Sequence, residues 1–211
     1  MKVMRCLFCI VIAIGIATTV HADTVLLNDN FDSENGGVGQ SGNYTNFANW
    51  SVTSGTVDLA GYGSWAVIPN YGGVYVDIDG SNWQAGTLTS KQAFNLTPGT
   101  VLLQFDLAGS HRGLDEGWRT NVVRVKLGDL YDESFTLNSE DPFTTYSRYI
   151  DITTTTNSYL SFQNMPDIYT GDNIGAFLDN VKLTSVVPEP ATMLLLGFGI
   201  LGLAGVRRIR K

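Results

Sequence analysis

The feature that most constrains the fold is a series of short stretches in which apolar and polar side chains alternate. In the clearest one, residues 101–107, every second side chain is Val, Leu or Phe. Residues 74–78 and 122–127 show the same period of two, which is the side-chain period of a β-strand. Further stretches of this kind are 50–53, 56–60, 87–90, 93–96, 134–137, 144–152, 160–162 and 177–184. Turn-forming Gly, Pro and Asn residues separate them, so the sequence predicts about ten or more short strands.

Strands of this number and length, with almost no helical periodicity, predict an all-β body. Two antiparallel sheets packed face to face, as in a jelly-roll β-sandwich, are the architecture that buries one face of each strand. Residues 23–186 have the length of one domain and contain no internal repeat or linker. We therefore expect a single β-sandwich domain over residues 23–186, flanked by the segments 1–22 and 187–211.

The N-terminal segment has the order of parts of a secretory signal peptide. Lys2 and Arg5 precede an apolar stretch from Leu7 to Ala17, and small residues close the segment at Ala22. This pattern predicts export and cleavage before Asp23.

The C-terminal segment combines three elements in a fixed order. Pro188-Glu189-Pro190 precedes an uncharged apolar run from Ala191 to Val206, and four basic residues end the chain. The prolines prevent helix before Ala191, and the run predicts a single hydrophobic helix with a basic stop behind it. Its 16 residues would form a helix of about 24 Å, which is short for a membrane span.

This arrangement resembles the PEP-CTERM sorting signal of Gram-negative bacteria, which an exosortase recognises and processes. The resemblance implies that Pro188, Glu189 and Pro190 form the sorting motif. It also implies transient anchoring in the membrane, followed by delivery to the outer surface or extracellular matrix. An uncleaved C-terminal anchor is the alternative interpretation.

Removal of both ends limits the chemistry that remains. Cys6 and Cys9 both lie in the signal segment, and His111 is the only histidine after residue 22. The body therefore has no disulfide, no thiol nucleophile and no multi-histidine zinc site. Seven Lys and Arg against nineteen Asp and Glu give residues 23–187 a net charge of −12. So acidic a surface repels nucleic acid, which we exclude as a partner.

Two segments of the body resemble the galactose-binding-like jelly rolls found in many carbohydrate-binding modules. The opening stretch LLNDNFD (26–32) is similar to the first strand of those domains, and FLDNVKL (177–183) is similar to their last strand. The stretches GVYVDIDGS (73–81) and LQFDLAG (103–109) resemble the core of exported bacterial proteins with this sandwich. The resemblance implies the fold and associates it with carbohydrate binding.

Asp179 is the candidate metal ligand. Strict alternation would place residues 177, 179, 181 and 183 on one face, so a carboxylate would lie among Phe, Val and Leu on the core side. In the domains that the sequence resembles, the acid of the last strand and an acid of the first segment bind one structural Ca²⁺. Asp32 is the matching acid here, which predicts Ca²⁺ between Asp32 and Asp179. The alternative is that Asp179 accepts hydrogen bonds from backbone amides or an arginine.

Two Trp-containing loops are the candidate sugar contacts, because sugar C–H faces pack on aromatic rings and sugar hydroxyls need polar partners. One is the segment with Asp79, Asn82 and Trp83, and the other is the His111-containing loop with Arg112 and Trp118. Trp50 and Trp65 stand in alternating stretches and are expected in the core.

Three functions remain open from the sequence. The first is a non-catalytic exported protein that binds or associates with extracellular polysaccharide. The second is a small polysaccharide-active hydrolase or lyase that uses loop carboxylates or His111, and the third is a structural matrix protein. The pairs Asp115-Glu116, Asp132-Glu133 and Glu140-Asp141 are adjacent in sequence and are expected on solvated turns, which favours the non-catalytic function.

Overall fold

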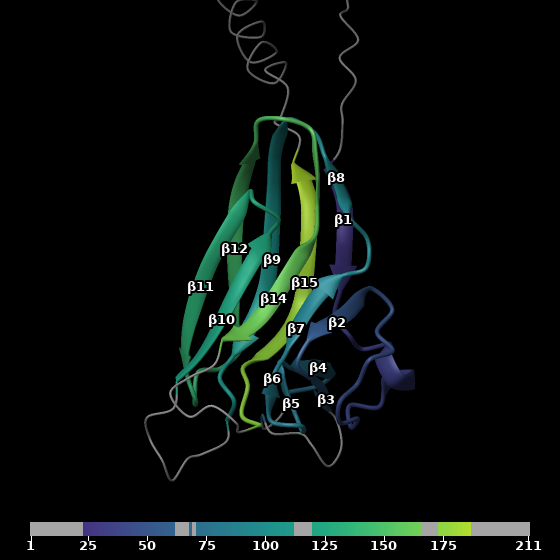
Figure 1. Ribbon diagram of the computed structural model, residues 1–211, viewed down its shortest axis with the longest axis vertical. Helices are drawn as coiled ribbons and strands as arrows, with labels where there is room; N and C mark the ends of the chain where they lie inside the picture. The colour runs from purple at the N-terminus through teal and green to yellow at the C-terminus, as the bar shows by residue number, and fades with distance from the viewer. Residues whose placement is uncertain (1–22, 62–67, 69–70, 112–119, 166–172, 187–211) are drawn as a thin grey trace, which may run out of the picture. The chain divides into compact units, whose positions relative to one another are not determined.

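The computed structural model describes residues 23–61, 68, 71–111, 120–165 and 173–186, and shows an antiparallel β-sandwich (Figure 1). The six-stranded sheet has the order β12-β9-β15-β4-β3, with β1 also paired to β15. Its strands are β1 (Thr24–Asp29), β3 (Asp58–Gly61), β4 (Val74–Asp77), β9 (Gly99–Ala108), β12 (Thr144–Ile152) and β15 (Phe177–Val186).

The five-stranded sheet has the order β11-β10-β14-β7-β2. Its strands are β2 (Trp50–Ser54), β7 (Thr87–Ser90), β10 (Thr120–Leu127), β11 (Tyr131–Asn138) and β14 (Leu160–Met165). Two small sheets pair β5 (Asp79–Gly80) with β6 (Gln84–Ala85) and β8 (Phe94–Leu96) with β13 (Thr156–Ser158), and a 3-10 turn, η1, covers Glu34–Gly37. The predicted all-β, two-sheet antiparallel sandwich is confirmed.

The core lies between the two large sheets and is supplied by the alternating stretches. Leu103 and Phe105 of β9, Val125 of β10 and Phe162 of β14 are completely buried, as is Trp50 of β2. Trp50 is therefore a core residue as expected, whereas Trp65 lies outside the described residues. Burying a side chain of this size stabilises the fold by about 1.5–3 kcal/mol, so the sandwich needs no disulfide to hold its sheets together.

One prediction about the last strand is wrong. A β-bulge between Asp179 and Lys182 shifts the register of β15 against β9, and Asn180 adopts a positive φ of 50°. Before the bulge Leu178 faces the main core, and after it Val181 and Leu183 do so. Asp179 therefore does not share a face with Val181 and Leu183, because the extra residue inverts the alternation within the strand.

A second, smaller apolar cluster covers the outer face of the six-stranded sheet beside Asp179. It contains Phe177 of β15, Tyr75 of β4, and Ala60, Ile68 and Ala108, with Tyr71 and Phe143 packed against them. The rings of Tyr71 and Phe143 lie 4.3 Å apart between centroids, and those of Tyr75 and Phe177 lie 4.9 Å apart. Asp179 is thus buried beneath this cluster rather than in the main core.

The flanking segments 1–22 and 187–211, with the predicted signal peptide and hydrophobic helix, lie outside the described residues. Within the described part of the chain, no helix has the length and apolar character that crossing a membrane requires.

Candidate functional site

The β5–β6 hairpin presents Trp83 at its tip. Trp83 is 64% exposed and has a left-handed backbone with φ of 63°, and its N–H donates to the carbonyl of Gly80 at 3.1 Å. Asn82 and Gln84 on either side of it are also exposed. A bulky residue at positive φ costs about 1–3 kcal/mol, so the surrounding contacts must hold the hairpin in this form.

Those contacts come from the segment that leads into β3. The Thr56 N–H donates to the carbonyl of Gln84 at 3.0 Å, and the Thr56 carbonyl accepts from the Gly80 N–H at 2.8 Å. The buried carboxylate of Asp58 accepts from the Ser81 N–H at 3.1 Å and from the Ser81 hydroxyl at 2.6 Å. The indole is therefore exposed on a hairpin that is fixed at its base.

The other predicted sugar contacts are placed differently or not described. Asp79 begins the same hairpin, but its side chain is buried and accepts from Asn164 Nδ2 at 3.3 Å. Its carboxylate therefore lies beneath the hairpin, whereas Asn82 and Trp83 lie on the surface. Arg112 and Trp118 lie outside the described residues, so the structure brings together only Asp79, Asn82 and Trp83 of the five predicted residues.

Asp179 is only 4% exposed and receives two hydrogen bonds. The Tyr71 hydroxyl donates to its Oδ2 atom, and the Asn180 N–H donates to its Oδ1 atom at 2.6 Å. Asn180 Nδ2 in turn donates to Asp106 Oδ2 at 2.8 Å. The carboxylate thus accepts one hydrogen bond from a backbone amide and one from a tyrosine hydroxyl.

Burial raises the pKa of Asp179 from the ordinary value of 3.8 to about 7. The hydrogen bonds from Tyr71 and Asn180 oppose this rise, while the negative charges of Asp32 and Asp106 add to it. The pKa of the Tyr71 phenol is raised too, mainly by burial and then by its bond to Asp179. Near neutral pH the Asp179 carboxylate is therefore costly to ionise.

Asp32, the predicted partner ligand, is close enough to Asp179 to influence its ionisation. Its Oδ1 atom accepts from the Val74 N–H at 2.8 Å and its Oδ2 atom from Asn30 Nδ2 at 2.6 Å. The pair supplies carboxylate oxygens, which suit Ca²⁺. Among the described residues no group of three or more His, Cys, Asp or Glu side chains is arranged to hold a metal, so backbone or amide oxygens would have to complete the shell.

His111, the candidate base of the enzyme hypothesis, is held by the loop after β11. Its backbone N–H donates to the Ser139 carbonyl at 2.8 Å. Its ring atom Nε2 lies 3.1 Å from the Asp141 carbonyl oxygen. Asp115, which the sequence places near it, lies outside the described residues.

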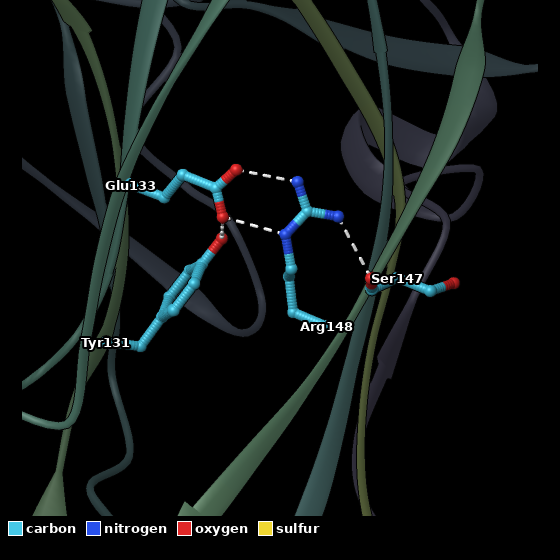
Figure 2. Close-up of polar contacts among 4 residues, drawn as sticks. All are labelled: Tyr131, Glu133, Ser147 and Arg148. Carbon is cyan, nitrogen blue, oxygen red and sulfur yellow. Dashed lines mark hydrogen bonds and ion pairs between the residues drawn. The ribbon is translucent and has the colours of Figure 1, made fainter.

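The acidic pair Asp132-Glu133 lies within β11 and not on a turn as predicted. β11 and β12 are edge strands of different sheets, and Arg148 of β12 binds Glu133 through two hydrogen bonds of 2.7 and 2.6 Å (Figure 2). The Tyr131 hydroxyl also donates to Glu133, at 2.6 Å. The hydrogen bonds from Arg148 and Tyr131 lower the pKa of Glu133. Asp132 is paired with Arg124, so both acids form ion pairs rather than a catalytic dyad.

A pocket of about 210 Å³ opens at another place on the body. It is lined by Leu26, Leu27, Ala48, Asn49, Ser90, Lys91, Gln92 and Phe94. Its walls combine apolar side chains with amides and one ammonium group, and it contains none of the predicted site residues.

Sequence reasoning missed Tyr71, Asp106 and Asn180 around Asp179. Asp106 carries a weak signal, because it falls on the polar side of the alternating stretch 101–107. Tyr71 carries no such signal, since it lies 108 positions from Asp179 in the chain.

Comparison with known families identifies the C-terminal segment. Residues 186–211 match the model of the PEP-CTERM protein-sorting motif. The chain therefore ends in a PEP-CTERM sorting signal, which marks a secreted protein of the kind typical of Gram-negative bacteria and implies processing by an exosortase. Comparison with curated proteins gives no match.

Among solved structures the body is similar to a Stig cyclase from Fischerella sp. TAU, with 16% identity, a TM-score of 0.53, and coverage of 80% of this chain and 100% of the cyclase. It is also similar to the CBM22-1 xylan-binding domain of Xyn10C from Paenibacillus barcinonensis (10% identity, TM-score 0.44, coverage 79% and 97%). A third similar structure is the C-terminal CBM6 of LamC from Zobellia galactanivorans (10% identity, TM-score 0.39, coverage 76% and 98%). At these identities the likeness concerns the fold.

Proposed function

We propose that the chain is an exported, non-catalytic protein that associates with extracellular polysaccharide through its β-sandwich and is sorted by its PEP-CTERM tail. The observation that carries the proposal is Trp83, an indole 64% exposed at the tip of a hairpin fixed at its base. Because the hairpin backbone is already fixed, packing of the ring on a sugar face requires little further ordering of the backbone. The neighbouring side chains of Asn82 and Gln84 supply amide donors and acceptors for hydroxyl groups.

Binding through a single exposed platform should be weak. Water competes for the hydroxyl hydrogen bonds, so we expect dissociation constants of about 10 µM to 1 mM, or about −7 to −4 kcal/mol. Trp118 and Arg112 remain proposed contacts on sequence grounds.

The test is glycan-array binding and titration calorimetry with residues 23–186. Trp83→Ala should abolish binding, whereas Tyr149→Ala should not, although Tyr149 on β12 is 70% exposed. Loss of binding in both variants, or in neither, would contradict a site at the hairpin.

The non-catalytic part of the proposal is supported by the way the acids are used. The described pair Asp132 and Glu133 is engaged with arginines, and Asp58 and Asp179 accept hydrogen bonds from protein groups. Incubation of residues 23–186 with neutral and acidic polysaccharides should release no product. Sustained release that is lost in His111→Ala would instead support a small hydrolase or lyase.

We also propose a structural Ca²⁺ held by Asp32 and Asp179. Its support is the buried Asp179 carboxylate, whose ionisation is opposed by burial and by the charges of Asp32 and Asp106. A divalent cation would offset this repulsion, and chelation should therefore lower the melting temperature of the body.

A further inference from the structure

The first and last strands of the body pair with each other. β1 runs antiparallel to β15, with Thr24 opposite Ser185 and Val25 opposite Thr184. The signal segment ends at residue 22, two positions before Thr24, and the sorting motif begins at Pro188, three positions after Ser185. The two points at which the chain enters and leaves the body therefore lie side by side at one end of the sandwich.

The spacer between the body and the sorting motif is very short. β15 remains paired to its last residue, Val186, which lies opposite Thr100 of β9. An extended chain spans at most about 3.6 Å per residue, so the two positions from Val186 to the start of the sorting motif add at most about 7 Å of chain. Opening the pairs of Ser185 and Val186 could add a similar length. If the strand opened beyond Thr184, it would also withdraw Leu183, which is completely buried in the core.

The Trp83 hairpin lies at the opposite end of the same strands. β15 begins at Phe177, which pairs with Asp77 of β4 and Ala108 of β9, and β5 begins two residues after Asp77. The ten residues of β15 span about 33 Å. Figure 1 shows the arrowhead of β15 at the top of the sandwich and β5 and β6 at the bottom.

The end of the sandwich beside the exit carries two uncharged loops and two acidic side chains. Residues 97–98 and 153–155, which connect β8 to β9 and β12 to β13, carry no charged side chain, and residues 153–155 are exposed threonines. Asp151, which is exposed and lies opposite Thr100, and Asp23, which precedes β1, are acidic side chains at the same end, so this end is not free of charge.

We propose that, while the tail is attached, the end of the sandwich where β1 begins and β15 ends faces the membrane, and the end with the Trp83 hairpin faces away from it. The short spacer favours this orientation, because only residues 187–190 separate Val186 from the apolar run 191–206 that the sorting signal is expected to insert into the bilayer. The inference rests on the PEP-CTERM assignment of the tail and is independent of glycan binding.

The orientation is measurable with single cysteines, because Cys6 and Cys9 can be replaced and the rest of the chain has none. Thr153→Cys marks the exit end. Glu140→Cys marks the far end, since the Gly109 N–H after β9 donates to the carbonyl of Asp141. The unprocessed full chain is made in a host without exosortase, labelled with a fluorophore, and inserted into phosphatidylcholine vesicles that contain a nitroxide-headgroup lipid.

We expect strong quenching of the label at position 153 and little at position 140, because about 33 Å separates the two ends. A control chain with twenty Gly and Ser residues inserted between Val186 and Val187 should reduce the difference, since such a linker has a mean span of about 25 Å. Both labelled proteins must melt at the temperature of the parent. Equal quenching at native spacing, stronger quenching at 140, or none at either label would overturn the proposal.

Discussion

Replacement of Asp179 by Asn should change the pH dependence of stability in a defined way. Burial raises the pKa of this carboxyl from 3.8 to about 7 in the folded body, so folding favours its protonated form. Between these two values the folded state binds one more proton than the unfolded state, and the stability of the wild type falls as pH rises. The contribution is fully present below about pH 4 and is lost once pH exceeds about 7.

The size of this change in stability follows from the shift in the pKa of Asp179. Each pKa unit corresponds to about 1.4 kcal/mol, so the rise of about three units predicts a loss of about 4 kcal/mol between pH 4 and pH 7. Asn at this position does not titrate, and its side-chain oxygen can still accept one of the two hydrogen bonds from Tyr71 and Asn180. The variant should therefore gain about 4 kcal/mol relative to the wild type over this range.

The assay is urea unfolding of residues 23–186 at closely spaced pH values in excess EDTA, with the free energy of unfolding compared at each pH. Asp129→Asn is the matched control, because Asp129 is an exposed acid on the turn between β10 and β11. A difference between wild type and Asp179→Asn that is constant from pH 4 to pH 7 would refute the reasoning about burial.

Calcium adds a second arm to the same experiment. An ion bound only by the folded state stabilises it by about 2.7 kcal/mol at a hundred times its dissociation constant. With Ca²⁺ at pH 8 the wild type should regain stability and Asp179→Asn should not. A melting curve of the wild type that is identical in EDTA and in Ca²⁺ would show that protein groups alone satisfy Asp179.

Three further predictions concern the tail, the sheet edge and the core. In a host with an exosortase, the intact mass of the mature protein should lack residues 194–211, and retention of that segment where other such tails are processed would contradict cleavage. Arg148→Met should lower the free energy of unfolding by about 1 kcal/mol or less near neutral pH, because the Glu133–Arg148 pair is about one third exposed. The loss should shrink as pH falls through the lowered pKa of Glu133, which a urea titration at pH 7 and pH 3 would measure. Leu103→Ala should cost about 2–5 kcal/mol in urea unfolding, since Leu103 is completely buried between the sheets, and a cost below 1 kcal/mol would contradict its place in the core.

Alternation was enough to predict most of the strands. The predicted stretches 87–90 and 144–152 coincide with β7 and β12, and 101–107 lies inside β9. Their faces were also predictable, because a period of two assigns every second side chain to the core as long as the strand is regular. The C-terminal sorting signal was equally readable, since its three elements are consecutive in the chain.

Contacts between distant segments were not readable in this way. The bulge at Asn180 is a feature of the pairing of β15 with β9, and it places Asp179 on the opposite face of the sheet from Val181 and Leu183. Likewise, Glu133 and Arg148 belong to different sheets and meet only because both sheets end at the same edge of the sandwich.

The sequence by itself therefore determined the fold class and the identity of the tail, because these depend on local periodicity and consecutive motifs. The tertiary structure alone decided the environment of Asp179, the anchoring of the Trp83 hairpin and the adjacency of the two chain ends. Each of these depends on strand register and on packing between segments as far apart as Tyr71 and Asp179, and a single sequence encodes no local signal for such pairings.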